Sequence, residues 1–120
     1  MMEEKIVLCG ANSYEQKYYF NEDFAGLPEQ VKQELKIMCV LYTEDIGGTL
    51  TLEFLDDGTL TLNVTREDAD YLFDEIGSEY KIRQIQREKE ELLRGLEQYF
   101  RVVFLGEDIE DIIAESEEED

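Results

Sequence analysis

The stretch LTLEFLDDGTLTLNV, residues 50–64, decides the fold. Large apolar side chains alternate with polar ones on both sides of an Asp-Asp-Gly turn, which is typical of two half-buried strands. A two-residue turn would pair Phe54 with Thr61 and put the two apolar sets on opposite faces. A three-residue loop ending at Gly58 pairs Phe54 with Leu60 and keeps both sets on one face. We therefore predict an antiparallel hairpin with Gly58 in the left-handed conformation.

Outward from this hairpin, turn and helix signals divide the rest of the chain. We predict a first hairpin over residues 5–21, a helix over 28–46, a short helix over 65–76 and a long helix over 79–105. A strand over 36–43 is the competing interpretation of the end of the first helix. The predicted fold is α+β with two layers: an antiparallel sheet of two hairpins covered by helices, in the order ββαββαα.

The length of 120 residues suits one domain. We expect this domain to cover residues 1–106. Residues 107–120 contain nine acidic residues and no basic one, so we expect an acidic, largely disordered tail. Ile37, Val40 and Leu41 make the last turns of the first predicted helix apolar on every side, and we expect that end to be deeply buried.

The charge of the chain is strongly negative and unevenly placed. The formal net charge is −20, yet residues 79–104 hold six of the eleven basic residues against five acidic ones. Such a charge argues against binding nucleic acid, because that affinity comes from Lys and Arg on phosphates. Anionic membranes are disfavoured for the same reason, and basic proteins or cations are the favoured partners.

The long predicted helix carries a seam of apolar residues at heptad spacing with one lysine in it. One interpretation is an amphipathic helix that covers the sheet. The other is a pairing surface for a partner helix or a second copy of the chain, with the lysine specifying register. The candidate interface residues are Ile82, Ile85, Lys89, Leu92 and Leu96.

Carboxylates cluster between residues 67 and 75 and offer the oxygen ligands that hard cations prefer. Their spacing does not match an EF-hand loop, so capping and a solvated face are the main interpretation, with a weak divalent-cation site as the alternative. Five aromatic residues between 14 and 24 form a second candidate surface, for which sheet core is the main interpretation and peptide binding the alternative.

Catalysis has little support in the sequence. The chain contains no histidine, which excludes Ser-His and Cys-His arrangements, and we identify no catalytic residue, cofactor site or metal-binding motif. Cys9 and Cys39 lie in separate predicted elements among apolar neighbours, so we expect buried free thiols. The acidic N-terminus does not read as a signal peptide, and we expect a cytoplasmic protein.

Several segments resemble a family of small acidic proteins from Gram-positive anaerobic bacteria that has no assigned activity. The resemblance rests on Leu27-Pro28, Glu34-Leu35, Ile37–Val40, Gly47-Gly48, Phe73–Ser78 and Tyr99–Gly106. It implies a bacterial cytoplasmic setting. A looser similarity to secretion chaperones, which are small, acidic, α+β and dimeric, is an analogy only.

The sequence favours a non-enzymatic protein-interaction module that self-associates or binds a partner through the helix over 79–105. One alternative is a small enzyme or divalent-metal-binding protein that uses the carboxylates over 67–75. The other is an acidic chaperone-like protein or nucleic-acid mimic that binds a basic partner.

Overall fold

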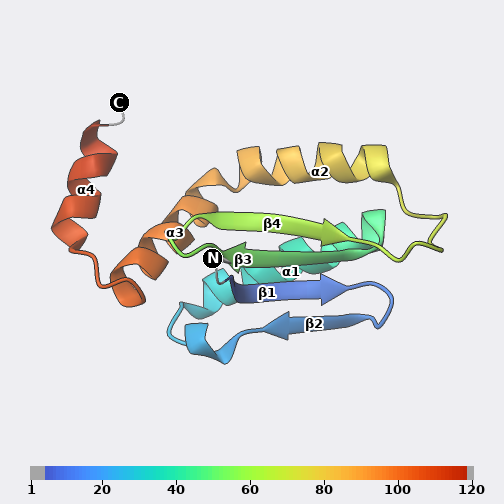
Figure 1. Ribbon diagram of the computed structural model, residues 1–120, viewed down its shortest axis with the longest axis horizontal. Helices are drawn as coiled ribbons and strands as arrows, with labels where there is room; N and C mark the ends of the chain where they lie inside the picture. The colour runs from blue at the N-terminus through green and yellow to red at the C-terminus, as the bar shows by residue number, and fades with distance from the viewer. Residues whose placement is uncertain (1–4, 119–120) are drawn as a thin grey trace.

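The computed structural model describes residues 5–118 and has an α+β fold (Figure 1). Four strands form one antiparallel sheet in the order β2-β1-β3-β4. These strands are β1 (Ile6–Asn12), β2 (Lys17–Phe20), β3 (Thr49–Phe54) and β4 (Leu60–Thr65). The two predicted hairpins are thus joined through β1 and β3, which confirms the fold class and the antiparallel sheet.

The β3–β4 hairpin has the register that its apolar pattern predicts. Phe54 pairs with Leu60, and the pairs Leu52–Leu62 and Leu50–Val64 follow along the ladder. Gly58 has a φ of 93°, as the three-residue loop requires. Leu50, Leu52 and Phe54 are fully buried, so the face chosen by the register is the face that packs on the core.

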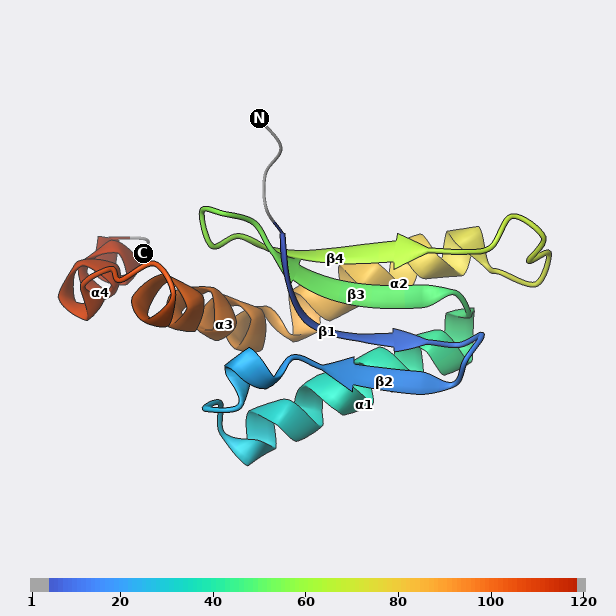
Figure 2. The ribbon, with the colours of Figure 1, turned by 60° about the horizontal axis from the view of Figure 1, so that its bottom comes forward.

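The helices lie on one face of the sheet and at one end of it. They are the 3₁₀ turn η1 (Glu22–Phe24), α1 (Glu29–Ile46), α2 (Glu75–Glu88), α3 (Glu90–Val103) and α4 (Ile109–Glu118). Helix α1 packs on β1, β2 and β3, α2 packs beside α1, and α3 packs on β4 (Figure 2). Because α1 is continuous, the competing interpretation of a strand over 36–43 is wrong.

An aromatic cluster fixes α3 on the end of the sheet. The ring centroids of Phe54 and Phe100 are 4.4 Å apart, and those of Phe24 and Phe104 are 4.8 Å apart. Phe24, Phe54 and Phe100 are almost fully buried. Burial of each such ring stabilises the fold by roughly 2–3 kcal/mol.

The predicted short helix over 65–76 is wrong. Strand β4 continues to Thr65, and a loop leads to α2, which begins at Glu75. The side chain of Asp74 accepts a hydrogen bond from the amide of Gly77 at 2.8 Å and caps α2. Gly77, which lies between the two predicted helices over 65–76 and 79–105, is therefore in the first turn of α2.

The predicted long helix over 79–105 is two helices. Helix α2 ends at Glu88 and α3 begins at Glu90, with Lys89 between them at φ −107° and ψ 21°. The change of direction lets α2 pack beside α1 while α3 packs on β4 and on the aromatic cluster. A single straight helix could not follow both surfaces.

The C-terminal segment is more ordered than we expected. Residues 109–118 form α4, and Ile112 on its inner side is only 3% exposed, which differs from the prediction of a largely disordered tail. In Figure 1, α4 projects beyond the end of the sheet next to α3. Residues 119–120 lie outside the described part of the chain.

Candidate interaction surface

The structure turns the seam that we predicted as an interface toward the protein's own core. Ile85 and Leu96 are 6% and 2% exposed and belong to the buried core, against which Ile82 and Leu92 pack. Lys89 places its ammonium nitrogen 3.0 Å from a carboxylate oxygen of Glu34 in α1. This arrangement agrees with the alternative of an amphipathic covering helix. The interface role of the seam stays a prediction, and a partner would meet only the parts of α2 that remain exposed.

A groove runs between α1 and α2, which we call the α1–α2 groove. Its volume is about 580 Å³, and it is lined by Gln30, Gln33, Glu34, Ile37, Met38, Leu41, Lys81, Gln84, Ile85, Glu88 and Lys89. Met38 and Ile85 are each 6% exposed and form its apolar floor. Two residues of the predicted seam, Ile85 and Lys89, therefore line a surface that a partner can reach.

Two ion pairs join the walls of the groove. Lys89 pairs with Glu34 at 3.0 Å, and Lys81 pairs with Asp45 at 3.6 Å. All four side chains are partly exposed, so each pair contributes little to stability, roughly 0–1 kcal/mol. Their lysines do balance the local charge: the lining of the groove contains as many basic as acidic residues. The groove is apolar and electrically balanced in a chain of net charge −20.

The rim of the groove contains apolar residues that we expected to be buried. Ile37 is 54% exposed and Leu41 49% exposed, so the predicted deep burial of this end of α1 is wrong for both. The sheet covers one side of α1 and α2 covers part of another, which leaves the remaining side open. The sequence did contain a signal for this exposure. The end of α1 is apolar on every side, and a chain of 120 residues has too few other elements to cover all sides of one helix.

The carboxylates over residues 67–75 serve the loop between β4 and α2. Asp70 accepts hydrogen bonds from the Tyr14 hydroxyl at 2.5 Å and from the Leu72 amide at 3.0 Å. The hydrogen bond to Asp70 raises the pKa of Tyr14. Glu75 forms an ion pair with Arg66 at 2.6 Å. Among the residues that the structure describes, no three histidine, cysteine or acidic side chains are grouped to hold a metal ion.

Most of the aromatic residues between 14 and 24 serve the fold. Tyr18 and Phe20 pack against the core, and Phe24 lies within it. Burial raises the pKa of Tyr18, whose buried hydroxyl lies near the Cys9 thiol. Tyr19 is 55% exposed on the opposite face of the sheet.

The two cysteines are free and buried, as predicted. Their sulfur atoms lie 4.0 Å apart, one on β1 and the other on α1. The contact with Cys9 raises the pKa of the Cys39 thiol, and burial raises it further. The same contact lowers the pKa of the Cys9 thiol. Both thiols are fully buried, which keeps them out of reach of a substrate.

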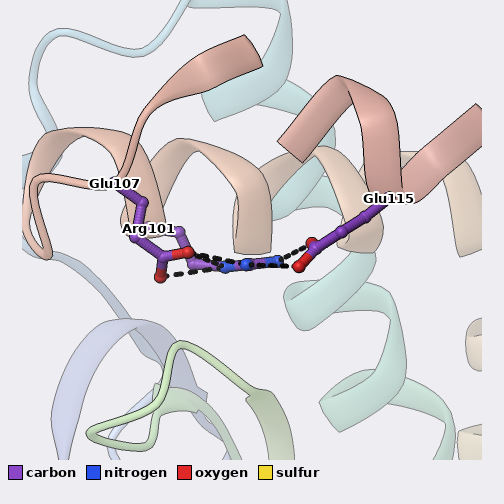
Figure 3. Close-up of polar contacts among 3 residues, drawn as sticks. All are labelled: Arg101, Glu107 and Glu115. Atoms are coloured by element: carbon purple, nitrogen blue, oxygen red, sulfur yellow. Dashed lines mark hydrogen bonds and ion pairs between the residues drawn. The ribbon is translucent and has the colours of Figure 1, made fainter. Parts of the chain in front are cut away.

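At the opposite end of the molecule, Arg101 ties α4 to α3. Its guanidinium donates to Glu107 at 2.6 Å and contacts Glu115 at 3.0 Å (Figure 3). The hydrogen bonds from Arg101 lower the pKa of Glu107. The neighbouring cleft of about 290 Å³ is lined largely by charged and polar side chains, which include Arg101, Glu107 and Glu115.

The comparisons with known proteins identify a family. A model described as a family of unknown function, DUF6145, matches residues 5–108. The chain belongs to this family. No curated protein and no solved structure matches the chain. The DUF6145 match covers β1 to α3 and ends just before α4, so the sheet, the α1–α2 groove and the loop before α2 all lie within the region that defines the family.

A last observation concerns membranes. Of the helices between residues 5 and 118, none combines the length and the apolar character that crossing a bilayer requires.

Proposed function

We propose that this DUF6145 protein is a non-enzymatic interaction module that binds a partner protein through the α1–α2 groove. The observation that carries the proposal is the pair Ile37 and Leu41, half exposed above a floor of Met38 and Ile85. Exposed apolar side chains bordering a groove are typical of surfaces that bind an amphipathic segment.

The balanced charge of the groove supports a partner with an apolar anchor. Desolvation of apolar side chains at the centre of an interface supplies most of its affinity, whereas charges at the rim contribute less. A second copy of the chain is the less favoured occupant, because two molecules of net charge −20 repel each other. The proposal places the module in the bacterial cytoplasm, where reducing conditions keep Cys9 and Cys39 as thiols.

The test compares two double variants in affinity capture from native lysate with quantitative mass spectrometry. Ile37→Ser with Leu41→Ser removes the rim of the groove, and we expect captured partners to fall at least about fivefold. Val103→Ser with Ile109→Ser is the matched control, because these side chains are 55% and 58% exposed outside the groove. Equal capture by the wild type and both variants would refute a role for the groove.

Sedimentation of the purified protein distinguishes the two occupants. A monomer at high micromolar concentration is expected for a module that binds another protein. A dimer that the Ile37→Ser, Leu41→Ser variant abolishes would instead make the second copy the occupant of the groove. All of these substitutions are at exposed positions, so loss of binding would not be a consequence of unfolding.

A further inference from the structure

The large apolar side chains with the highest exposed fractions in the described chain lie outside the α1–α2 groove, where the loop after β4 enters α2. Tyr71 and Leu72 are each 93% exposed, Ile76 is 85% exposed and Tyr80 is 69% exposed. We call these four residues the tip patch. Ile76 and Tyr80 are one turn apart on α2 and lie side by side. A single exposed apolar residue needs no explanation, but four together on one segment indicate a binding surface.

The loop that carries the tip patch is held in place on the sheet side. A Cβ added at Gly48 would lie 2.8 Å from the ring of Phe73, so this ring rests directly on the glycine backbone. The guanidinium of Arg66 lies 5.6 Å from the centre of the same ring and also pairs with Glu75. These contacts fix both ends of the loop.

A second set of contacts joins the loop to the β1–β2 turn. The Tyr14 hydroxyl donates to Asp70 at 2.5 Å and accepts from the amide of Glu67 at 3.0 Å. Asp70 in turn accepts from the amide of Leu72. Tyr71 and Leu72 are therefore exposed on a braced loop whose neighbouring residues Asp70 and Phe73 contact the fold. An arrangement of this kind reduces the entropy lost on binding.

The surroundings of the tip patch determine which partner it suits. Residues 66–80 contain six acidic residues and one basic residue, and an excess of acidic charge remains after Arg66 pairs with Glu75 and Arg83 pairs with Glu79. The α1–α2 groove, in contrast, is electrically balanced. An acidic border around an apolar centre attracts Lys and Arg and repels another acidic surface. A second copy of this chain is disfavoured on the same ground.

We propose that the tip patch binds a basic amphipathic segment of another protein. The apolar side of that segment would cover Leu72, Ile76 and Tyr80, and its Lys and Arg side chains would lie against the surrounding carboxylates. This inference concerns a surface separate from the α1–α2 groove and does not depend on the groove being occupied. A module with both surfaces would bind two segments. The α1–α2 groove would select its segment by apolar contact, and the tip patch would select its segment by apolar contact and by positive charge.

The experiment uses the full chain and a synthetic probe. The probe is a fluorescent peptide with leucine at helical spacing and lysine at all other positions, and its binding is followed by anisotropy. Leu72→Ser with Ile76→Ser should weaken binding roughly tenfold, because these two aliphatic side chains are almost fully exposed and available to an apolar partner. Both are more than 80% exposed, and the variants are expected to melt like the wild type.

Matched controls separate the tip patch from the groove and from general charge. Ile37→Ser with Leu41→Ser should weaken binding of this probe much less than the tip-patch variant does, so failure of the groove proposal and failure of this one are distinguishable. Asp68→Asn, beside the patch, should weaken binding more than Glu110→Gln on α4 at the opposite end of the molecule (Figure 1). Both changes remove one exposed charge.

Three results would overturn the inference. The first is equal binding of the probe to the wild type and the Leu72→Ser, Ile76→Ser variant, which would show attraction to the net charge alone. The second is equal binding of a matched peptide in which every lysine is glutamate. The third is a dimer of the full chain that only the tip-patch variant abolishes, which would make a second copy the occupant.

Discussion

At the scale of single residues, two adjacent glycines carry different constraints. Gly47 and Gly48 join α1 to β3 and have φ values of 96° and 69°. A Cβ at Gly48 would lie 2.6 Å from the carbonyl oxygen of Thr65 and 2.8 Å from the ring of Phe73. A Cβ at Gly47 would meet its nearest neighbours only at 4.0 Å. A side chain at Gly48 would therefore combine backbone strain with a clash, whereas one at Gly47 would cause backbone strain alone.

This difference predicts unequal effects of the same substitution. Gly47→Ala should lower the free energy of unfolding by about 1–3 kcal/mol, because its φ of 96° and ψ of −169° lie in a region that essentially only glycine adopts. Gly48→Ala should lower it by about 2–5 kcal/mol, because overpacking adds to the cost of an alanine at positive φ. Urea unfolding of the two variants measures the difference, and Gly47→Ala is the control. Equal losses would mean that Phe73 moves aside without cost and that the loop is not braced on Gly48.

At the scale of elements, the sequence predicts the sheet better than the helices. The β3–β4 hairpin follows from a pattern of period two and one glycine, and its register has only one solution that buries Leu50, Leu52 and Phe54 together. Local pattern and tertiary packing agree there. The register of this hairpin could be predicted residue by residue because one short turn and the alternation of apolar side chains determine it.

The segment after β4 was mispredicted because its residues interact over long distances. Asp70 bonds to Tyr14, 56 positions away in the chain, and Phe73 packs on Gly48. Carboxylates that suggested a helix start instead accept hydrogen bonds within a loop and cap a later helix. The break at Lys89 has the same origin, since α2 and α3 follow different surfaces. The tip patch was missed because the exposure of Ile76 and Tyr80 depends on that loop.

Helix α4 provides a prediction at this scale. Ile112→Ser should detach α4, because Ile112 is 3% exposed whereas Ile109 and Ile113 of the same helix are 58% and 51% exposed. Amide exchange over 109–118 should then approach that of an unstructured peptide, while the midpoint of global unfolding changes little. Ile113→Ser, at a residue 51% exposed, is the control and should leave exchange unchanged. Loss of protection throughout the sheet would show that α4 belongs to the cooperative core.

The docking of α4 should also depend on pH. The hydrogen bonds from Arg101 lower the pKa of Glu107 in the folded protein below its ordinary value of 4.5. The contribution of this pair is therefore present above that ordinary value and is lost as the pH falls through the lowered one. Methyl resonances of Ile112 should report detachment in acid. Arg101→Gln should remove this dependence, and an unchanged profile in that variant would assign it to other carboxylates.

At the scale of the whole molecule, repulsion among carboxylates opposes folding. The net charge is −20, and the ion pairs that the structure shows are largely on the surface, where each contributes only about 0–1 kcal/mol. Dissolved salt screens the repulsion between carboxylates over the whole surface, whereas the attractions that it also screens are few and weak. The same charge that favours a basic partner at the tip patch therefore makes the isolated protein sensitive to salt.

We predict that raising NaCl from about 20 mM to about 300 mM raises the melting temperature by about 5 °C, since screening of this repulsion is worth roughly 1–2 kcal/mol. A decrease would mean that the surface ion pairs outweigh the repulsion. MgCl₂ at the same ionic strength separates screening from a bound cation. Equal shifts in the two salts indicate screening alone. A larger shift in MgCl₂ that Asp68→Asn removes would instead support a divalent-cation site in the acidic loop and would reassign its carboxylates from attracting a basic partner to binding metal.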